Sequence, residues 1–194
     1  MRARTAVLAL GLAALAGGGE IDAQERSSRR RQGRSAVTRR HGCASPSIHV
    51  DKSDGVLELR CAGVPYRRYF ATFGANPVGP KLREGDERTP EGTYHLVSRG
   101  VSGRFHRFMG LSYPNDADLH RASQLGIDRP GRGVGIHGAG GERGWLMSLW
   151  IPFAHRLGVV TRWGPTDGCI ALANRDVAEL FRHVDVGTPV TIVP

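Results

Sequence analysis

The sequence predicts a β-rich α+β domain, built as a barrel or sandwich, with one C-terminal helix. Short runs of alternating apolar and polar residues recur from residue 47 onward between glycine-containing turns, and this pattern is typical of half-buried strands. The clearest amphipathic helix pattern lies near the end of the chain. The length of 194 residues leaves room for one ordinary domain and an N-terminal extension.

The N-terminal extension begins with the features of a secretory signal. Two arginines precede an apolar run at 6–16, and Ala14-Leu15-Ala16 offers a small-x-small cleavage site, with Ala23 as a second candidate. We therefore expect a signal peptide over residues 1–23 and export to the periplasm or cell envelope. An uncleaved anchor is the alternative.

The formal net charge of +9 is concentrated just after this signal. Seven arginines fall within residues 24–42, where Glu25 is the sole acidic residue. Charge runs interleaved with Ser, Gln and Gly are usually disordered. We therefore expect a basic disordered linker over 24–46, a folded domain over 47–194, and no nucleic-acid partner. A tether onto anionic envelope polymers, or onto an envelope lipoprotein, is the functional alternative for the linker.

The folded domain opens with a meander, since glycine turns at Asp54-Gly55 and Ala62-Gly63 separate three apolar-alternating runs. Residues 103–130 otherwise give no clear pattern. The expected elements, in chain order, are strands at 48–50, 56–61 and 64–73, a loop at 74–92, a strand at 93–97, a short helix at 117–125 and a strand at 133–136.

The last part of the domain contains two helical patterns. Between residues 138 and 165, two Trp-Leu groups follow helical spacing and suggest a lid or wall over a site. Near the end, Asn174 is the expected N-cap of a helix that Gly187 terminates, and a final strand follows. The lid pattern consists of Trp145, Leu146, Leu149 and Trp150, the helix pattern of Val177, Leu180, Phe181 and Val184, and the strand pattern of Val190 and Ile192.

The chain has three cysteines, an odd number. In an exported protein, an odd count suggests one disulfide and one remaining thiol. Cys43 and Cys61 lie at the two ends of a predicted hairpin, so we expect them to form the disulfide. Cys169 is then the free thiol.

Cys169 has the sequence context of a nucleophile. It follows Gly168, which lets the backbone bend sharply, so the N–H groups of both residues are expected to point at one oxyanion. An unperturbed thiol is only a few per cent thiolate at neutral pH, so it needs a basic partner. The structural alternative is a buried free cysteine that acts as a small hydrophobe.

His137 is the candidate partner among the eight histidines. It ends the apolar strand 134–136 and precedes the glycine-rich loop 138–141, which places it at an exposed rim. Together with Cys169 it suggests a Cys–His pair. A metal site that uses His137, Cys169 and Asp167 is a weaker alternative, because the close ligand spacing of zinc motifs is missing.

Several motifs together resemble the catalytic domain of the L,D-transpeptidase (YkuD) family. The resemblance spans about residues 47–194. The matching pieces are Ile136-His137-Gly138, Thr166-Asp167-Gly168-Cys169-Ile170, the opening hairpin with Ile48-x-Val50-x-Lys52-Ser53, the turn Gly85-Asp86-x-x-Thr89-Pro90-x-Gly92, and the closing Gly187-Thr188-Pro189-Val190.

The resemblance implies a role for each site residue. Cys169 is the implied nucleophile, His137 the general base, and Gly168 part of the oxyanion site. Thr166 and Asp167 stand where the family's commonest form has Ser and His, and Ser112-Tyr113-Pro114-Asn115 resembles the YafK-like branch. The implied substrate-binding residues are Thr166, Asp167, Gly138 and Tyr113.

The implied reaction is acyl transfer on peptidoglycan stem peptides, which forms 3-3 or protein-to-wall cross-links without a metal or cofactor. A hydrolase that cleaves such links is one alternative. A catalytically inactive domain that only binds stem peptides is another, although the retention of both Cys169 and His137 argues against it.

Overall fold

The computed structural model describes residues 42–140, 153 and 166–194. The chain divides into two units, Met1–Thr38 and Arg39–Pro194, and all described residues belong to the second. The expected signal peptide, the expected linker up to residue 41 and the Trp-Leu pattern of the expected lid lie outside the described residues. Neither helix in the described ranges is long and apolar enough to cross a membrane.

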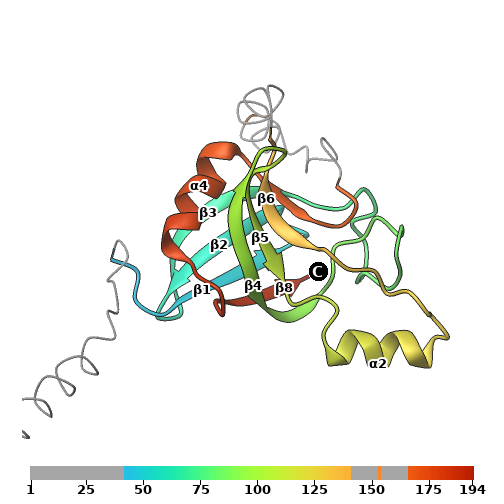
Figure 1. Cartoon of the computed structure of the whole chain (residues 1–194). Helices are drawn as coiled ribbons and strands as arrows, with labels where there is room; N and C mark the ends of the chain where they lie inside the picture. The colour runs from blue at the N-terminus through green and yellow to red at the C-terminus, as the bar shows by residue number, and fades with distance from the viewer. Residues whose placement is uncertain (1–41, 141–152, 154–165) are drawn as a thin grey trace, which may run out of the picture. The chain divides into compact units, whose positions relative to one another are not determined.

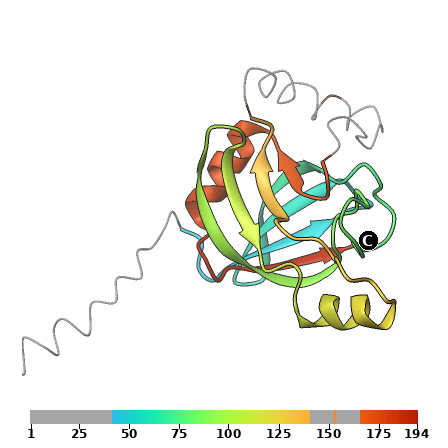
Figure 2. The same cartoon turned by 45° about the vertical axis from the view of Figure 1, so that its right-hand side comes forward.

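Eight strands close into a barrel (Figures 1 and 2). Around the barrel the strands follow the order β1-β2-β3-β7-β6-β5-β4-β8. This arrangement confirms the β-rich fold and selects the barrel over the open sandwich. The strands are β1 (Pro46–Asp51), β2 (Val56–Cys61), β3 (Val64–Thr72), β4 (Gly92–Ser102), β5 (His106–Leu111), β6 (Gly135–Gly138), β7 (Ile170–Leu172) and β8 (Pro189–Val193).

Two of the strand pairs are parallel, and both involve segments far apart in the chain. β1 pairs with β8, and β6 pairs with β7. The other neighbours around the barrel are antiparallel. Parallel neighbours need long crossover connections, so residues on β6 and β7 meet only through the tertiary fold.

The barrel interior is filled by the residues that alternate along the strands. Ile48 and Val50 on β1, and Leu57 and Leu59 on β2, are at most 2% exposed, and burying a side chain of this size stabilises the fold by about 1.5–3 kcal/mol. The helix α4 (Asn174–His183) lies against the barrel (Figure 1) and buries its apolar face in the same core. That face consists of Val177, Leu180 and, just after the helix, Val184.

The second helix, α2 (Asp116–Gln124), agrees with the short helix expected at 117–125. Asn115 caps it: the Asn115 side chain accepts a hydrogen bond from the N–H of Asp118, whose carboxylate accepts one from the N–H of Asn115. This reciprocal pair satisfies two donors at the helix start.

Two strands were not predicted from the sequence, β5 and β7. In β5, Met109, Gly110 and Leu111 are all buried, and all three residues of β7 are buried as well. Strands covered on both faces read as continuous apolar runs rather than as alternation. This explains why their sequences gave no clear strand pattern.

Asn174 is not the helix cap that the sequence predicted. The N-cap of α4 is Ala173, which makes no side-chain cap bond. The amide oxygen of Asn174 instead accepts a hydrogen bond from the N–H of Gly140 at 3.2 Å. The first turn of α4 therefore holds the loop that follows β6.

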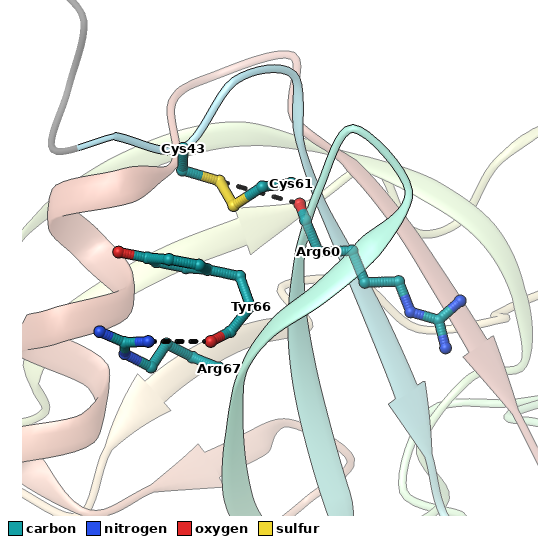
Figure 3. The surroundings of a disulfide bond; sticks show 5 residues. All are labelled: Cys43, Arg60, Cys61, Tyr66 and Arg67. Carbon is teal, nitrogen blue, oxygen red and sulfur yellow. Dashed lines mark hydrogen bonds between the residues drawn. A yellow bond between two sulfur atoms is a disulfide. The ribbon is translucent and has the colours of Figure 1, made fainter.

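Cys43 and Cys61 are joined by a disulfide, with their Cα atoms 5.1 Å apart (Figure 3). The bond ties the segment before β1 to the end of β2. Nearby, the Arg67 guanidinium lies over the Tyr66 ring at 4.3 Å, and Tyr66 meets His183 of α4 edge-on at 5.5 Å. The disulfide thus closes the barrel end at which α4 packs.

We expect Cys43→Ala and Cys61→Ala each to lower the free energy of unfolding by about 3 kcal/mol, because either change opens the loop that the bond closes. Urea denaturation measures this change. As a control, the unreduced wild type should titrate a single thiol under denaturing conditions. Finding three thiols there would contradict the disulfide.

Candidate active site

The site is built on the parallel pair of β6 and β7. Ile136 lies opposite Ile170, and His137 lies opposite Ala171. Side chains alternate along a strand, and the two isoleucines belong to the barrel core. His137 and Ala171 therefore face the other way. Cys169 directly precedes β7, two positions from Ala171, so the same alternation brings it to the His137 face.

The imidazole of His137 is held by two aromatic rings and one carbonyl. The centroid of the Phe105 ring lies 4.3 Å from that of the imidazole. The centroid of the Phe108 ring lies 6.3 Å away, and this ring is nearly parallel to the imidazole. The His137 side chain is only 6% exposed. Its Nδ1 lies 2.7 Å from the carbonyl oxygen of Gly138. Since a carbonyl can only accept, Nδ1 carries the proton and Nε2 is the basic nitrogen.

The surroundings of His137 favour its neutral form. Burial lowers the pKa of His137, the hydrogen bond to Gly138 offsets part of that effect, and the positive charge of Arg104 lowers the pKa further. The net pKa lies below the ordinary histidine value. At neutral pH the imidazole is therefore available as a base.

The loop after His137 is fixed by backbone contacts. Gly138 donates to the carbonyl of Phe105 at 3.0 Å, and Ala139 donates to that of Leu172 at 3.1 Å. A Cβ on Gly138 would lie 2.6 Å from the Asn174 amide oxygen and 2.9 Å from the Phe105 carbonyl. This close packing requires a glycine at position 138, and substrate binding by Gly138 stays a prediction.

The turn before Cys169 is organised by Thr166. Its hydroxyl donates to the carbonyl of Cys169 at 2.6 Å and accepts from the N–H of Gly168 at 3.1 Å. Its backbone also bonds to the end of β3, through the carbonyl of Phe73 and the N–H of Ala75. Thr166, expected at the substrate, therefore braces the turn before Cys169.

This bracing corrects the expectation that Gly168 supplies an oxyanion donor. Its N–H is already bonded to Thr166. The glycine is required for a different reason: its φ is +124°, and a Cβ there would lie 2.4 Å from the carbonyl oxygen of Arg88. The close approach of these two backbones sets the position of Cys169.

Cys169 is a half-buried free thiol that donates weakly to the carbonyl of Gly133, 3.8 Å away. Burial raises its pKa above the ordinary thiol value, and the negative charge of Asp167 adds to that rise. A hydrogen bond from the backbone of Gly135 and the positive charge of Lys81 act in the opposite direction without cancelling it. The resting site therefore holds a thiol and a neutral imidazole.

The two remaining substrate candidates differ in exposure. Asp167 is exposed beside the thiol. Tyr113 is only 5% exposed, its ring meets Tyr94, and its hydroxyl donates to the carbonyl of Pro130 at 2.7 Å. Tyr113 is therefore a core residue that supports the segment leading to Gly133, not a surface contact.

Lys81 and Asn174 are site residues that the sequence did not mark. The motif around Asp86 indicates a turn, but nothing in the sequence shows that a lysine five residues earlier is buried. Across the described ranges, no group of three or more His, Cys, Asp or Glu side chains is arranged to hold a metal ion.

Comparison with known proteins agrees with this geometry. The chain matches the L,D-transpeptidase catalytic domain family (YkuD) over residues 45–192. Among curated proteins, none matches the sequence.

Solved structures share the fold. Bd1075 of Bdellovibrio bacteriovorus is 20% identical, with a TM-score of 0.51 over 78% of this chain and 49% of that one. The helical cell shape determining protein Pgp2 of Campylobacter jejuni is 24% identical, with a TM-score of 0.51 over 76% of this chain and 47% of that one. This chain thus spans about half the length of these two relatives. Because the family match covers well over half of the sequence, the chain belongs to the L,D-transpeptidase catalytic domain (YkuD) family.

Proposed function

We propose that the chain catalyses cysteine-dependent acyl transfer on peptidoglycan stem peptides and forms 3-3 or protein-to-wall cross-links. The observation that carries this proposal is the placement of a free thiol directly before β7 and a basic imidazole nitrogen on β6, the parallel strand beside it. The family match gives the substrate class.

The first half-reaction forms a thioester. Nε2 of His137 takes the proton of the Cys169 thiol as the sulfur attacks the carbonyl carbon of a stem-peptide bond next to a meso-diaminopimelate centre. The C–N bond then breaks, and His137 returns the proton to the departing amine. In the second half-reaction, the side-chain amine of another stem attacks the thioester, which forms the new amide and restores the thiol.

The oxyanion of each tetrahedral intermediate needs a donor. Because the N–H of Gly168 is bonded to Thr166, the N–H of Cys169 itself is the candidate. Its position is set by the bond from Thr166 to the Cys169 carbonyl. A donor of this kind contributes roughly 3–4 kcal/mol to the transition state.

A hydrolase is the second candidate function. Water in place of the amine would cleave the same thioester. The segment 166–172, with the sequence TDGCIAL, resembles the YafK-like branch, and this resemblance favours hydrolysis. Under either reading we place the protein in the periplasm or cell envelope. The basic segment 24–46 is proposed to contact anionic envelope polymers or an envelope lipoprotein.

Cys169→Ala should abolish activity on cell-wall peptides, because the thioester cannot form. Incubation with purified muropeptides and mass spectrometry of the products measures this. A carbapenem should add its mass to the wild type and leave the variant unmodified. Full muropeptide turnover by Cys169→Ala would refute the enzymatic proposal, and the wild type's products distinguish cross-linking from hydrolysis.

Asp167→Ala should weaken muropeptide turnover without abolishing it. Removing this carboxylate takes away a negative charge that raises the pKa of the thiol, so acylation by a carbapenem should be retained or become faster. Transfer to the acceptor should slow if the carboxylate orients the acceptor amine. Separate rates for carbapenem acylation and muropeptide turnover test this, and a complete loss of both would contradict it.

The pH profile of acylation should show a displaced acid limb. Burial lowers the pKa of His137, so the base stays unprotonated, and activity persists, to a lower pH than an ordinary histidine of pKa about 6.5 would allow. Rates of carbapenem adduct formation between about pH 4 and 9 measure this. A rate that instead rises steadily into the alkaline range would indicate that the thiol must be ionised by solvent, without general-base help from His137.

A further inference from the structure

Lys81 is a buried lysine beneath the nucleophile turn. It is 4% exposed, and its Nζ lies 2.8 Å from Oδ1 of Asp86. A Cβ placed on Gly168 would lie 3.5 Å from this Nζ, and one on Gly131 would lie 3.0 Å from the Cε. The side chain therefore passes between the backbone that leads to β6 and the backbone that leads to Cys169.

The partner of Lys81 remains ionised. Burial alone would raise the pKa of Asp86, but its hydrogen bonds outweigh burial, and the net pKa is lowered. The ionised carboxylate forms an ion pair with Lys81. The donors to Asp86 are the Nζ of Lys81 and the backbone N–H groups of Leu82, Arg83 and Arg88.

Few charges act on the thiol. Asp167 disfavours the thiolate, whereas Lys81 favours it. His137 is neutral in the resting site and leaves no positive charge there. The charged groups that act on the Cys169 thiol are Asp167 in its own turn and Lys81 in the loop before β4, and Lys81 is paired with Asp86. The backbone of Gly133 and of Gly135, before and in β6, also contacts the sulfur.

We propose that Lys81, held by Asp86, is a positioning residue that supplies the positive charge which stabilises the Cys169 thiolate as the proton moves to His137. The buried charge of Lys81 offsets that of the exposed Asp167. The inference rests on the proposed function only in that Cys169 is the nucleophile.

Lys52 provides a matched control. It is also 4% exposed, and its Nζ is paired with Glu91 at 2.6 Å. It holds the same loop, since it donates to the carbonyls of Gly79 and Thr89. A loss that arises merely from loosening the loop should therefore appear in Lys52→Met as well as in Lys81→Met.

The experiment measures thiolate formation without any cell-wall substrate. With Cys43 and Cys61 in a disulfide, Cys169 is the single thiol that iodoacetamide can modify in the native full-length protein. Alkylation rates across pH then report its ionisation. Near neutral pH, we expect Lys81→Met to slow alkylation about threefold to tenfold, with a midpoint at higher pH and an unchanged rate at the alkaline plateau. Lys81→Arg should restore most of the rate, and Asp167→Asn should shift the midpoint to lower pH.

Lys81→Met leaves Asp86 buried without its cation, which threatens folding. The double variant Lys81→Met/Asp86→Asn removes both charges and should show the same slowing, with folding checked by thermal unfolding. An unchanged midpoint in both variants would overturn the proposal, as would an equal shift in Lys52→Met. Either result would leave the muropeptide and carbapenem tests of the reaction standing, because those tests depend on Cys169 rather than on Lys81.

Discussion

The parallel pairing of β6 with β7 is the constraint on which the active site depends. It places Ile136 beside Ile170 in the core, and both are fully buried. A slip of one residue would turn these side chains outward and His137 inward, which the core would not tolerate. The packing of two isoleucines therefore keeps His137 and Cys169, the proposed base and nucleophile, on the same face, although 32 positions separate them in the sequence.

The loop between β3 and β4 has little regular secondary structure, and buried polar groups organise it instead. Lys52, Asp86 and Thr89 satisfy its backbone, the last by accepting from the N–H of Gly74 at 3.0 Å. Burying ion pairs is costly, and they stabilise a fold less than apolar contacts of similar size. Here they hold the Arg88 carbonyl so close to residue 168 that a Cβ at that position would clash with it, and only glycine fits. The gain is a fixed position for the nucleophile turn.

Burial acts on His137 and Cys169 in complementary ways. It lowers the pKa of His137 and raises that of Cys169, so both are neutral in the resting protein. In the proposed reaction, charge appears only when the proton moves from sulfur to nitrogen. The groups proposed to stabilise this charge are already in place, and preorganised dipoles and charges of this kind need no rearrangement during reaction. Under this proposal the polar groups of the site stabilise the intermediate rather than the free enzyme.

Much of this protein follows from local sequence. The alternation in 48–61 gives the first hairpin, and the i, i+3, i+7 spacing from Val177 gives the last helix, because each pattern records burial of one face of a continuous segment. The glycine before Cys169, and the strand before His137, led to the proposal that these two residues react as a pair. Local pattern does not show how a segment is covered on its second face, so it did not predict β5 and β7.

Other features depend on contacts between segments that are distant in the chain. These features are the closure of the barrel, the hydrogen bond that occupies the N–H of Gly168, the burial of Tyr113 and the position of the Lys81 charge beneath the turn. Only the tertiary structure decided them, since each is a contact between residues whose separation along the chain carries no periodic signal.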